Sequence, residues 1–158
     1  MSTRSMTVVA SGSGTFTYLY RHHDGYPAIA GAAIVRALER KPADPEAMVC
    51  ALLSNRYNAK GDEVKLDWTE QGERVYQLVN YGPEKQGDLE HVYILRLKPE
   101  GWTVSHHARG RMTESNDDYR EWTTQHYKAA DFAVFVGREV AELERRIEEH
   151  AKRAGRRS

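Results

Sequence analysis

The segment from Leu89 to Lys98 constrains the fold more than any other part of this chain. Its centre, Val92-Tyr93-Ile94-Leu95, is apolar at every position, whereas a strand with one face in water alternates apolar and polar residues. Pro99-Glu100-Gly101 then signals a turn, and the stretch 102–107 can return beside the first segment. The pattern predicts a central strand of an antiparallel sheet, with Tyr93 and Leu95 buried.

An N-terminal hairpin is predicted ahead of any helix. The run from Met6 to Ala10 is apolar and β-branched, and the run from Thr15 to Tyr20 alternates between the two faces of a strand. Ser11-Gly12-Ser13-Gly14 joins them, and glycine supplies the positive φ that tight turns need. The two strands are therefore expected to pair antiparallel.

Weaker strand signals follow at 64–68 and 74–80. The stretch 81–88 is interpreted as a hairpin loop, so the strand at 74–80 should pair with the one at 89–98. Three or four consecutive strands would then form a meander. The polar stretch from 108 to 127 is expected to be one long loop, and such loops in small domains are often functional.

Two helices are predicted between the hairpin and the meander. The first runs from Pro27, which suits a first helical position, to about Arg40, and Asp24 can accept hydrogen bonds from its free N–H groups. Gly31 costs this helix about 1 kcal/mol relative to alanine, which close packing, most simply on the sheet, would offset. The second helix covers 46–56, with Asp44 as its N-cap.

The inner side of the second helix is expected to carry Met48, Leu52 and either Val49 or Cys50. Cys50 is interpreted as a small buried apolar residue, because nothing nearby in the sequence would activate its thiol. It is the only cysteine, which excludes an internal disulfide framework and fits a reducing compartment.

A third helix is predicted from Ala129 to about Lys152. Its apolar side chains recur at helical spacing, which predicts a covered stripe. We expect the sheet to cover the start of this stripe and a second copy of the chain to cover its end. The stripe consists of Phe132, Val136, Val140, Leu143 and Ile147.

The order of these elements, ββααββββα, predicts an α+β fold. We expect an antiparallel sheet of about five to six strands, helices mainly on one face and a long C-terminal helix. Residues 1–158 should form a single domain, ending in a basic and frayed tail at 153–158.

The charge balance bears on function. The 158 residues include 23 Lys and Arg and 23 Asp and Glu, so the formal net charge is zero. Bulk nucleic-acid binding is not expected from such a balance, although a local basic patch stays open. No apolar run approaches the roughly 20 residues needed to span a bilayer, and no secretory signal is visible. These features predict a soluble cytoplasmic protein without membrane partners.

The richest candidate site is the turn between the hairpin and the first helix. A cation, an imidazole and an aromatic ring beside a helix N-terminus can hold an anion, and a nucleotide would suit them. The alternative is that Asp24 caps the helix, a histidine bonds to it and Tyr26 packs. The candidate ligand-binding residues are Tyr20, Arg21, His22, His23, Asp24 and Tyr26.

A second basic patch follows the central strands. It comprises His106, His107, Arg109 and Arg111 and could meet nucleic acid or an acidic partner, or be a solvated strand end. Metal binding is not expected, because neighbouring strand residues point to opposite faces and each His pair offers at most one ligand. No Gly-x-Ser-x-Gly elbow is present, and no catalytic residue or cofactor is assigned.

The first 30 residues also carry a resemblance. The start Met1-Ser2-Thr3-Arg4-Ser5 and the turn Tyr20-Arg21-His22-His23-Asp24-Gly25-Tyr26-Pro27 resemble those of small phage and prophage proteins. The resemblance implies action in the cytoplasm of a bacterial host, by binding a host defence protein or sequestering an anionic, nucleotide-type signal. Two alternatives stay open: a small hydrolase or nuclease using His22, His23 and Asp24, or an assembly protein dimerising through the C-terminal helix.

Overall fold

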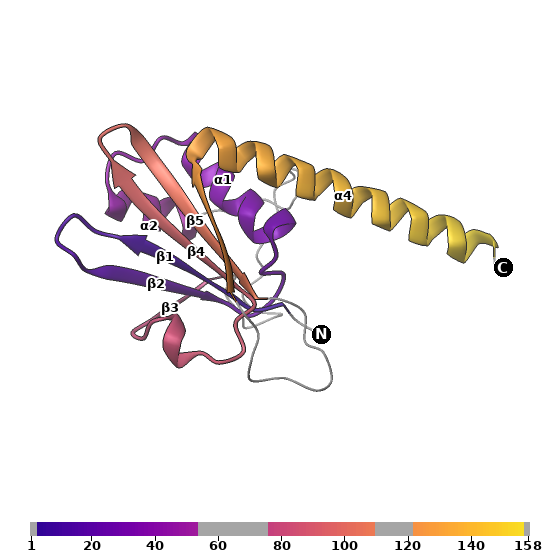
Figure 1. The fold of residues 1–158 in the computed structure, drawn as a ribbon, viewed down its shortest axis with the longest axis horizontal. Helices are drawn as coiled ribbons and strands as arrows, with labels where there is room; N and C mark the ends of the chain where they lie inside the picture. The colour runs from indigo at the N-terminus through magenta and orange to yellow at the C-terminus, as the bar shows by residue number, and fades with distance from the viewer. Residues whose placement is uncertain (1–2, 54–75, 110–121, 157–158) are drawn as a thin grey trace.

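The computed structural model describes residues 3–53, 76–109 and 122–156. Six strands and a set of helices form an α+β fold (Figure 1). The elements in chain order are β1 (Ser5–Ala10), β2 (Phe16–Arg21), η1 (Pro27–Gly31), α1 (Ala32–Glu39), α2 (Pro45–Leu53), β3 (Gln77–Val79), η2 (Pro83–Lys85), β4 (His91–Lys98), β5 (Gly101–Arg109), β6 (Trp122–Lys128) and α4 (Ala129–Arg156).

The sheet has the order β3-β2-β1-β4-β5-β6. The predicted hairpin is present, with Val8 opposite Tyr18, and β4 lies at the centre with Tyr93 and Leu95 fully buried. All pairings are antiparallel except the one between β1 and β4, which is parallel. The sheet is therefore mixed, although mostly antiparallel. The prediction that β4 is a buried central strand is confirmed, but its neighbour β1 pairs with it parallel rather than antiparallel.

The helices other than η2 cover one face of the sheet, which confirms the prediction of helices mainly on one face (Figure 1). The main core lies between them, and Leu19, Tyr93, Val104 and Phe132 are all fully buried in it. Alternate strand residues point to the opposite side, which we call the second face. Over β1 and β2 the second face is covered by the chain that leads from β3 to β4, which buries Met6 and Leu89. Over β5 and β6 no described element covers it.

The predicted meander is wrong in one strand. β3 pairs with β2 at the far edge of the sheet and not with β4. The stretch 81–88 is therefore a crossover beneath β2 and β1 rather than a hairpin loop, and Tyr81 and Leu89 pack against the second face. The strand signal at 64–68 lies outside the described residues.

The predicted loop at 108–127 is also wrong at its C-terminal end. Residues 122–128 form β6, which pairs with β5 from Trp122 opposite Arg109 to Lys128 opposite Thr103. Residues 123–126 of β6 are polar in succession, because β6 is an exposed edge strand. The polar composition of β6 is therefore the reason that its sequence was interpreted as a loop.

The first helix begins at Pro27, as predicted, but Asp24 does not cap it. The N-cap residue is Tyr26, which makes no side-chain capping bond, and Asp24 has a positive φ of 54° in the turn before it. Gly31 does mark a close approach, since a Cβ there would lie 2.8 Å from Val136 Cγ2. The element that packs so closely is α4 rather than the sheet.

The second helix confirms its predicted start, because the Ala47 N–H donates to Asp44 Oδ1 at 2.7 Å. Met48 and Leu52 are buried as expected. Cys50 is exposed, which corrects the prediction of a buried thiol, and Val49 is the neighbour that packs on the core. The predicted residues beyond Leu53 lie outside the described residues.

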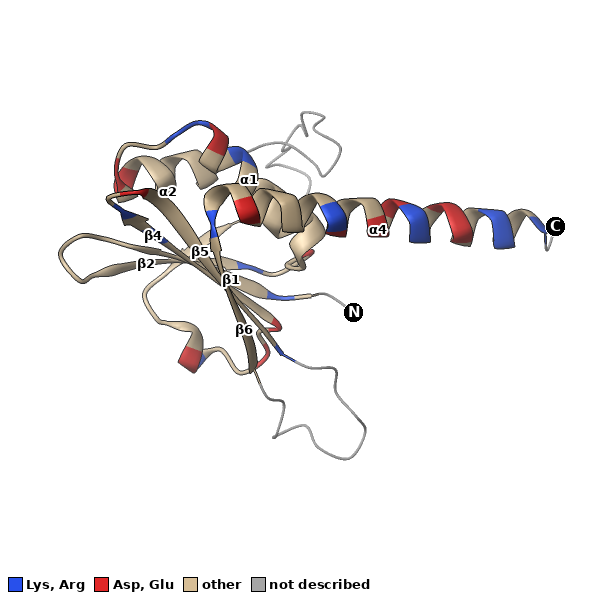
Figure 2. Ribbon diagram, turned by 45° about the horizontal axis from the view of Figure 1, so that its top comes forward, with Lys and Arg blue, Asp and Glu red and all other residues tan. Residues whose placement is uncertain are grey.

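The C-terminal helix α4 continues to Arg156, so the basic segment expected to fray from 153 is helical as far as it is described. Phe132 and Val136 are buried against η1 and the sheet, whereas Ile147 is 58% exposed. The outer half of α4 extends away from the body of the protein (Figure 1), and charges of both signs alternate along it (Figure 2). Within the described part of the chain, no helix combines the length and apolarity needed to cross a membrane.

Candidate functional site

The predicted binding turn does not bring its residues to one surface. Arg21 is 8% exposed, its Nε donates to the His23 carbonyl at 2.8 Å, and its guanidinium lies 5.5 Å from the ring centroid of Tyr76. Tyr76 belongs to the core on the helix side. Arg21 is therefore engaged beneath the helices rather than presented to an anion.

His22 lies on the opposite side of the strand. Its Nδ1 is 3.0 Å from the Tyr20 hydroxyl and accepts a bond of 3.3 Å from Arg4 Nε. Arg4 also forms an ion pair of 2.6 Å with Asp88. Because successive strand residues point to opposite faces, His22 and Tyr20 share the second face, while Arg21 does not.

The remaining turn residues are shaped by packing. His23 meets the His22 ring edge to face at 4.5 Å between centroids, and Asp24 is exposed. Burial and the neighbouring Asp24 carboxylate raise the pKa of the half-buried Tyr26 above its usual value. The Asp24 carboxylate thus favours the protonated form of the Tyr26 hydroxyl. The described contacts do not join it with His22 into an acid–base pair, which the hydrolase alternative needs.

The second basic patch is divided between the two faces of the sheet. His106 lies on the helix side, 7% exposed, stacked on Tyr93 at 4.8 Å and sharing a 2.9 Å hydrogen bond with His91. Burial, and then the neighbouring His91 and His107, lower the pKa of His106 to about 3. Burial lowers the pKa of His91 to about 4. Both rings are therefore neutral core residues at physiological pH.

His107 and Arg109 lie on the second face, while Arg111 is outside the described residues. His107 Nδ1 shares a 2.8 Å hydrogen bond with the Thr124 hydroxyl. Burial lowers the pKa of His107, and the nearby His126 and Arg96 lower it further. Of these two groups, Arg96 places a permanent positive charge on this part of the second face.

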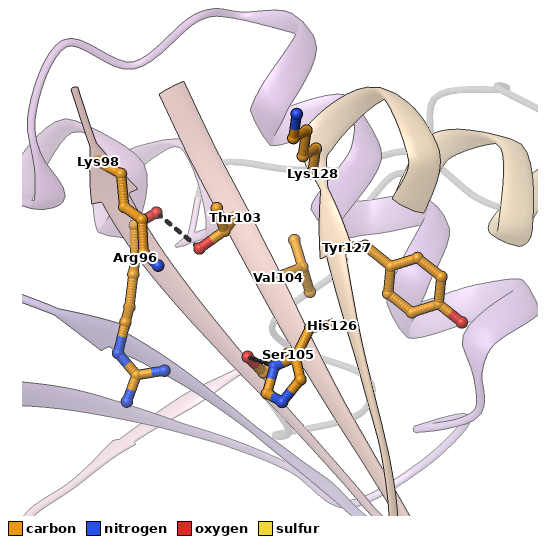
Figure 3. A pocket seen from close by; sticks show the side chains of 8 residues that line it. All are labelled: Arg96, Lys98, Thr103, Val104, Ser105, His126, Tyr127 and Lys128. Atoms are coloured by element: carbon orange, nitrogen blue, oxygen red, sulfur yellow. Dashed lines mark hydrogen bonds between the residues drawn. The ribbon is translucent and has the colours of Figure 1, made fainter. Parts of the chain in front are cut away.

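A basic groove lies at the end of this face, over β4, β5 and β6, with a volume of about 410 Å³ (Figure 3). Ser105 Oγ shares a 2.8 Å hydrogen bond with His126 Nδ1 across its floor, and the Thr103 hydroxyl donates to the Arg96 carbonyl at 3.4 Å. None of its eight described lining residues is acidic. They are Arg96, Lys98, Thr103, Val104, Ser105, His126, Tyr127 and Lys128.

An apolar groove of about 450 Å³ follows it along the same strands. Val92 and Ile94 form its floor, and the crossover around η2 forms one wall. Trp122 lies at its end, 38% exposed, with the Arg109 guanidinium 4.6 Å from its ring centroid. Arg109 is itself held by a 2.6 Å hydrogen bond to the Gly87 carbonyl.

Few sequence features predicted these two grooves. Their residues come from β4, β5 and β6, and β6 was expected to be loop. Alternation at 103, 105, 107 and 109 was the available signal, since it places Thr, Ser, His and Arg on one face.

Among residues 3–53, 76–109 and 122–156, no three His, Cys, Asp or Glu side chains lie close enough together to share a metal ion.

Comparison of the chain with protein-family models, with curated proteins and with solved structures finds no match.

Proposed function

We propose that this chain is a binding protein for a phosphate-bearing, nucleotide-type ligand, which docks in the basic groove. The observation that carries the proposal is the lining of that groove: Arg96, Lys98 and Lys128 surround hydroxyl and imidazole groups, and none of the described lining residues carries a carboxylate. A phosphate fits this chemistry, because Arg offers a bidentate fork and Lys a point charge.

The resemblance of the first 30 residues to phage proteins supplies a setting for this activity. In a bacterial host, a protein that sequesters a nucleotide-type signal would counteract the defence system that depends on it. The anion site is then the second face of the sheet rather than the turn at 20–26, since Arg21 is buried and His22 lies apart from it.

Isothermal titration calorimetry with a panel of mononucleotides and inorganic phosphate tests the proposal. We expect binding that weakens as salt rises. Lys128→Ala should reduce affinity about five- to tenfold, the loss of one exposed charge contact worth about 1 kcal/mol. Lys152→Ala is the matched control, because Lys152 is exposed on the outer half of α4 and far from the groove.

Two results would contradict this function. The first is a lack of binding by every phosphate-bearing probe. The second is an equal effect of Lys128→Ala and Lys152→Ala, which would mean that the ligand senses only the overall charge. Thermal unfolding of both variants shows whether either substitution disturbs the fold.

One observation favours a second candidate function, assembly through α4. Its outer half extends beyond the body (Figure 1), and Ile147, 58% exposed, continues the apolar stripe that is buried at Phe132 and Val136. A second copy of the chain could cover this stripe. Dimerisation and ligand binding use different surfaces and are compatible with each other.

A further inference from the structure

We infer that the ligand of the second face is a single strand of nucleic acid, which runs along β4, β5 and β6. Its phosphates lie in the basic groove and one of its bases lies in the apolar groove against Trp122. This inference rests on the proposed function, because it names the class of phosphate-bearing ligand. It adds the neighbouring groove, which a free phosphate would not use.

Positive charge is concentrated on the second face of the sheet. The chain as a whole is neutral, yet among the described strand residues that point to the second face no Asp or Glu occurs, whereas Arg and Lys do. The acidic residues lie on other elements, such as α4 (Figure 2) and the crossover, which carries Glu84 and Asp88. On β4, β5 and β6 the second-face residues are Val92, Ile94, Arg96, Lys98, Gly101, Thr103, Ser105, His107, Arg109, Trp122, Thr124, His126 and Lys128.

The two grooves adjoin each other along the same strands. The strand register places Ile94, Ser105 and His126 side by side across the sheet. This row separates the two grooves and contributes residues to both. From Trp122 to Lys128 the face extends for about 20 Å at roughly 3.3 Å per strand residue. That length exceeds a single nucleotide and suits a short stretch of a strand.

The two grooves differ in their chemistry. The apolar groove offers Val92, Ile94 and the indole of Trp122, on which the flat face of a base can stack. Its one acidic lining residue, Glu84, would repel a phosphate but can accept a hydrogen bond from a base amino group. The alternation of a base site and a phosphate site matches a nucleic acid rather than an anionic protein.

A single strand fits better than a duplex. In a duplex the bases are stacked and paired, so none could enter the apolar groove without being unstacked first. A β-sheet that carries aromatic and basic side chains on an exposed face is a general solution for binding splayed bases and their backbone. Sequence preference should be weak, since stacking and phosphate contacts are available to every base.

Fluorescence anisotropy with labelled probes tests the inference. The probes are an unstructured single-stranded RNA and DNA of the same sequence, the corresponding blunt duplex, and the mononucleotides as competitors. We expect both single strands to bind more tightly than the duplex and far more tightly than any mononucleotide. The logarithm of affinity should fall linearly with the logarithm of salt, and Lys128→Ala should make this slope shallower by about 0.7.

Trp122→Ala is the decisive variant. Loss of one stacked base should weaken single-strand binding about 5- to 150-fold, with little change in mononucleotide phosphate binding. Leu78→Ala is the matched control, because Leu78 is an exposed apolar residue on β3, at the edge of the sheet opposite β6. Its affinity should equal that of the unaltered protein. Circular dichroism and thermal unfolding verify that both variants are folded.

The possible results separate the inference from the proposed function. If mononucleotides bind as tightly as single strands and Trp122→Ala has no effect, the inference fails while the proposed function stands. Equal affinity for duplex and single strand also overturns the inference. If no phosphate-bearing probe binds, both fail together.

Discussion

The hydroxyl of Tyr93 donates a buried hydrogen bond of 2.9 Å to the carbonyl oxygen of Gly25, 68 residues earlier in the chain. This bond ties the central strand β4 to the turn that precedes η1. The Gly25 N–H donates to the Thr3 carbonyl at 2.8 Å, so both backbone groups of Gly25 are used. The backbone of the turn is therefore tied to the central strand and to the N-terminal segment.

Gly25→Ala should be strongly destabilising. A Cβ at this position would lie 2.6 Å from Ser5 Cβ and 2.9 Å from the Ser5 backbone nitrogen, and a strand cannot shift easily. Overpacking of this kind costs about 1–3 kcal/mol, measured as the free energy of unfolding in urea. Gly12→Ala is the control and should be tolerated, because nothing lies within 4 Å of its Cβ position. Equal stability of the two variants would contradict the packing argument.

Tyr93→Phe should lower the free energy of unfolding by about 1–3 kcal/mol, the cost of leaving a buried carbonyl without its donor. The ring is fully buried, so its apolar contacts survive the substitution. Chemical denaturation measures the change. A neutral result would mean that a water molecule replaces the hydroxyl at the Gly25 carbonyl.

The two aspartates proposed as helix caps should behave differently. Asp44→Ala removes the acceptor of the Ala47 N–H and should cost about 1 kcal/mol in the free energy of unfolding. Asp24→Asn should be nearly neutral, because Asp24 caps no helix and asparagine tolerates its positive φ. If Asp24→Asn proved the more damaging substitution, the turn would depend on the Asp24 charge.

Stability should fall in mild acid. In the unfolded chain His91 and His106 bind protons near pH 6.5, whereas in the folded protein their pKa values are lowered to about 4 and about 3. Their neutral state therefore imposes no penalty above pH 6.5, and stability is lost as the pH falls from 6.5 toward 4. The loss by pH 5 should be on the order of 2–4 kcal/mol.

Urea unfolding at a series of pH values measures this loss. His106→Gln should make the acid dependence shallower by about one proton, because glutamine can still bond to His91 but does not titrate there. His150→Gln is the control, since His150 is exposed on α4. An unchanged slope in His106→Gln would show that other groups cause the acid sensitivity.

Local sequence patterns predicted where strands occur better than they predicted which strands pair with each other. Alternation and turn residues were sufficient for the N-terminal hairpin, and the apolar run predicted the burial of Tyr93 and Leu95. The pairing of β3 with β2 was missed, because the crossover at 81–88 has the same Gly and Pro content as a hairpin loop. β6 was missed because an edge strand exposed to water need not be apolar.

The candidate site shows the same difference: some of its individual residues could be picked out from the sequence, but not which of them lie together in space. Sequence neighbours such as Arg21 and His22 were expected to act together, but a strand sends them to opposite faces. The basic groove joins residues from three strands, which only the tertiary pairing brings together. The zero net charge concealed it, because the acidic residues that balance the count lie on other elements (Figure 2).

The outer half of α4 provides the last prediction. Val140 and Leu143 are half-buried and Ile147 is exposed, and their spacing of three and four residues is that of a seam between packed helices. If two copies of the chain pair through this seam, Ile147→Glu should raise the dissociation constant of the dimer at least tenfold, since burying an isoleucine contributes about 1.5–3 kcal/mol.

Val134→Glu is the matched control on α4, because Val134 is equally exposed at 57% but lies on the other side of the helix. Sedimentation equilibrium over a range of concentrations measures both variants. A protein that sediments as a monomer throughout, with or without Ile147→Glu, would leave α4 as a solvated helix stabilised by its own ion pairs, such as that between Arg146 and Glu142.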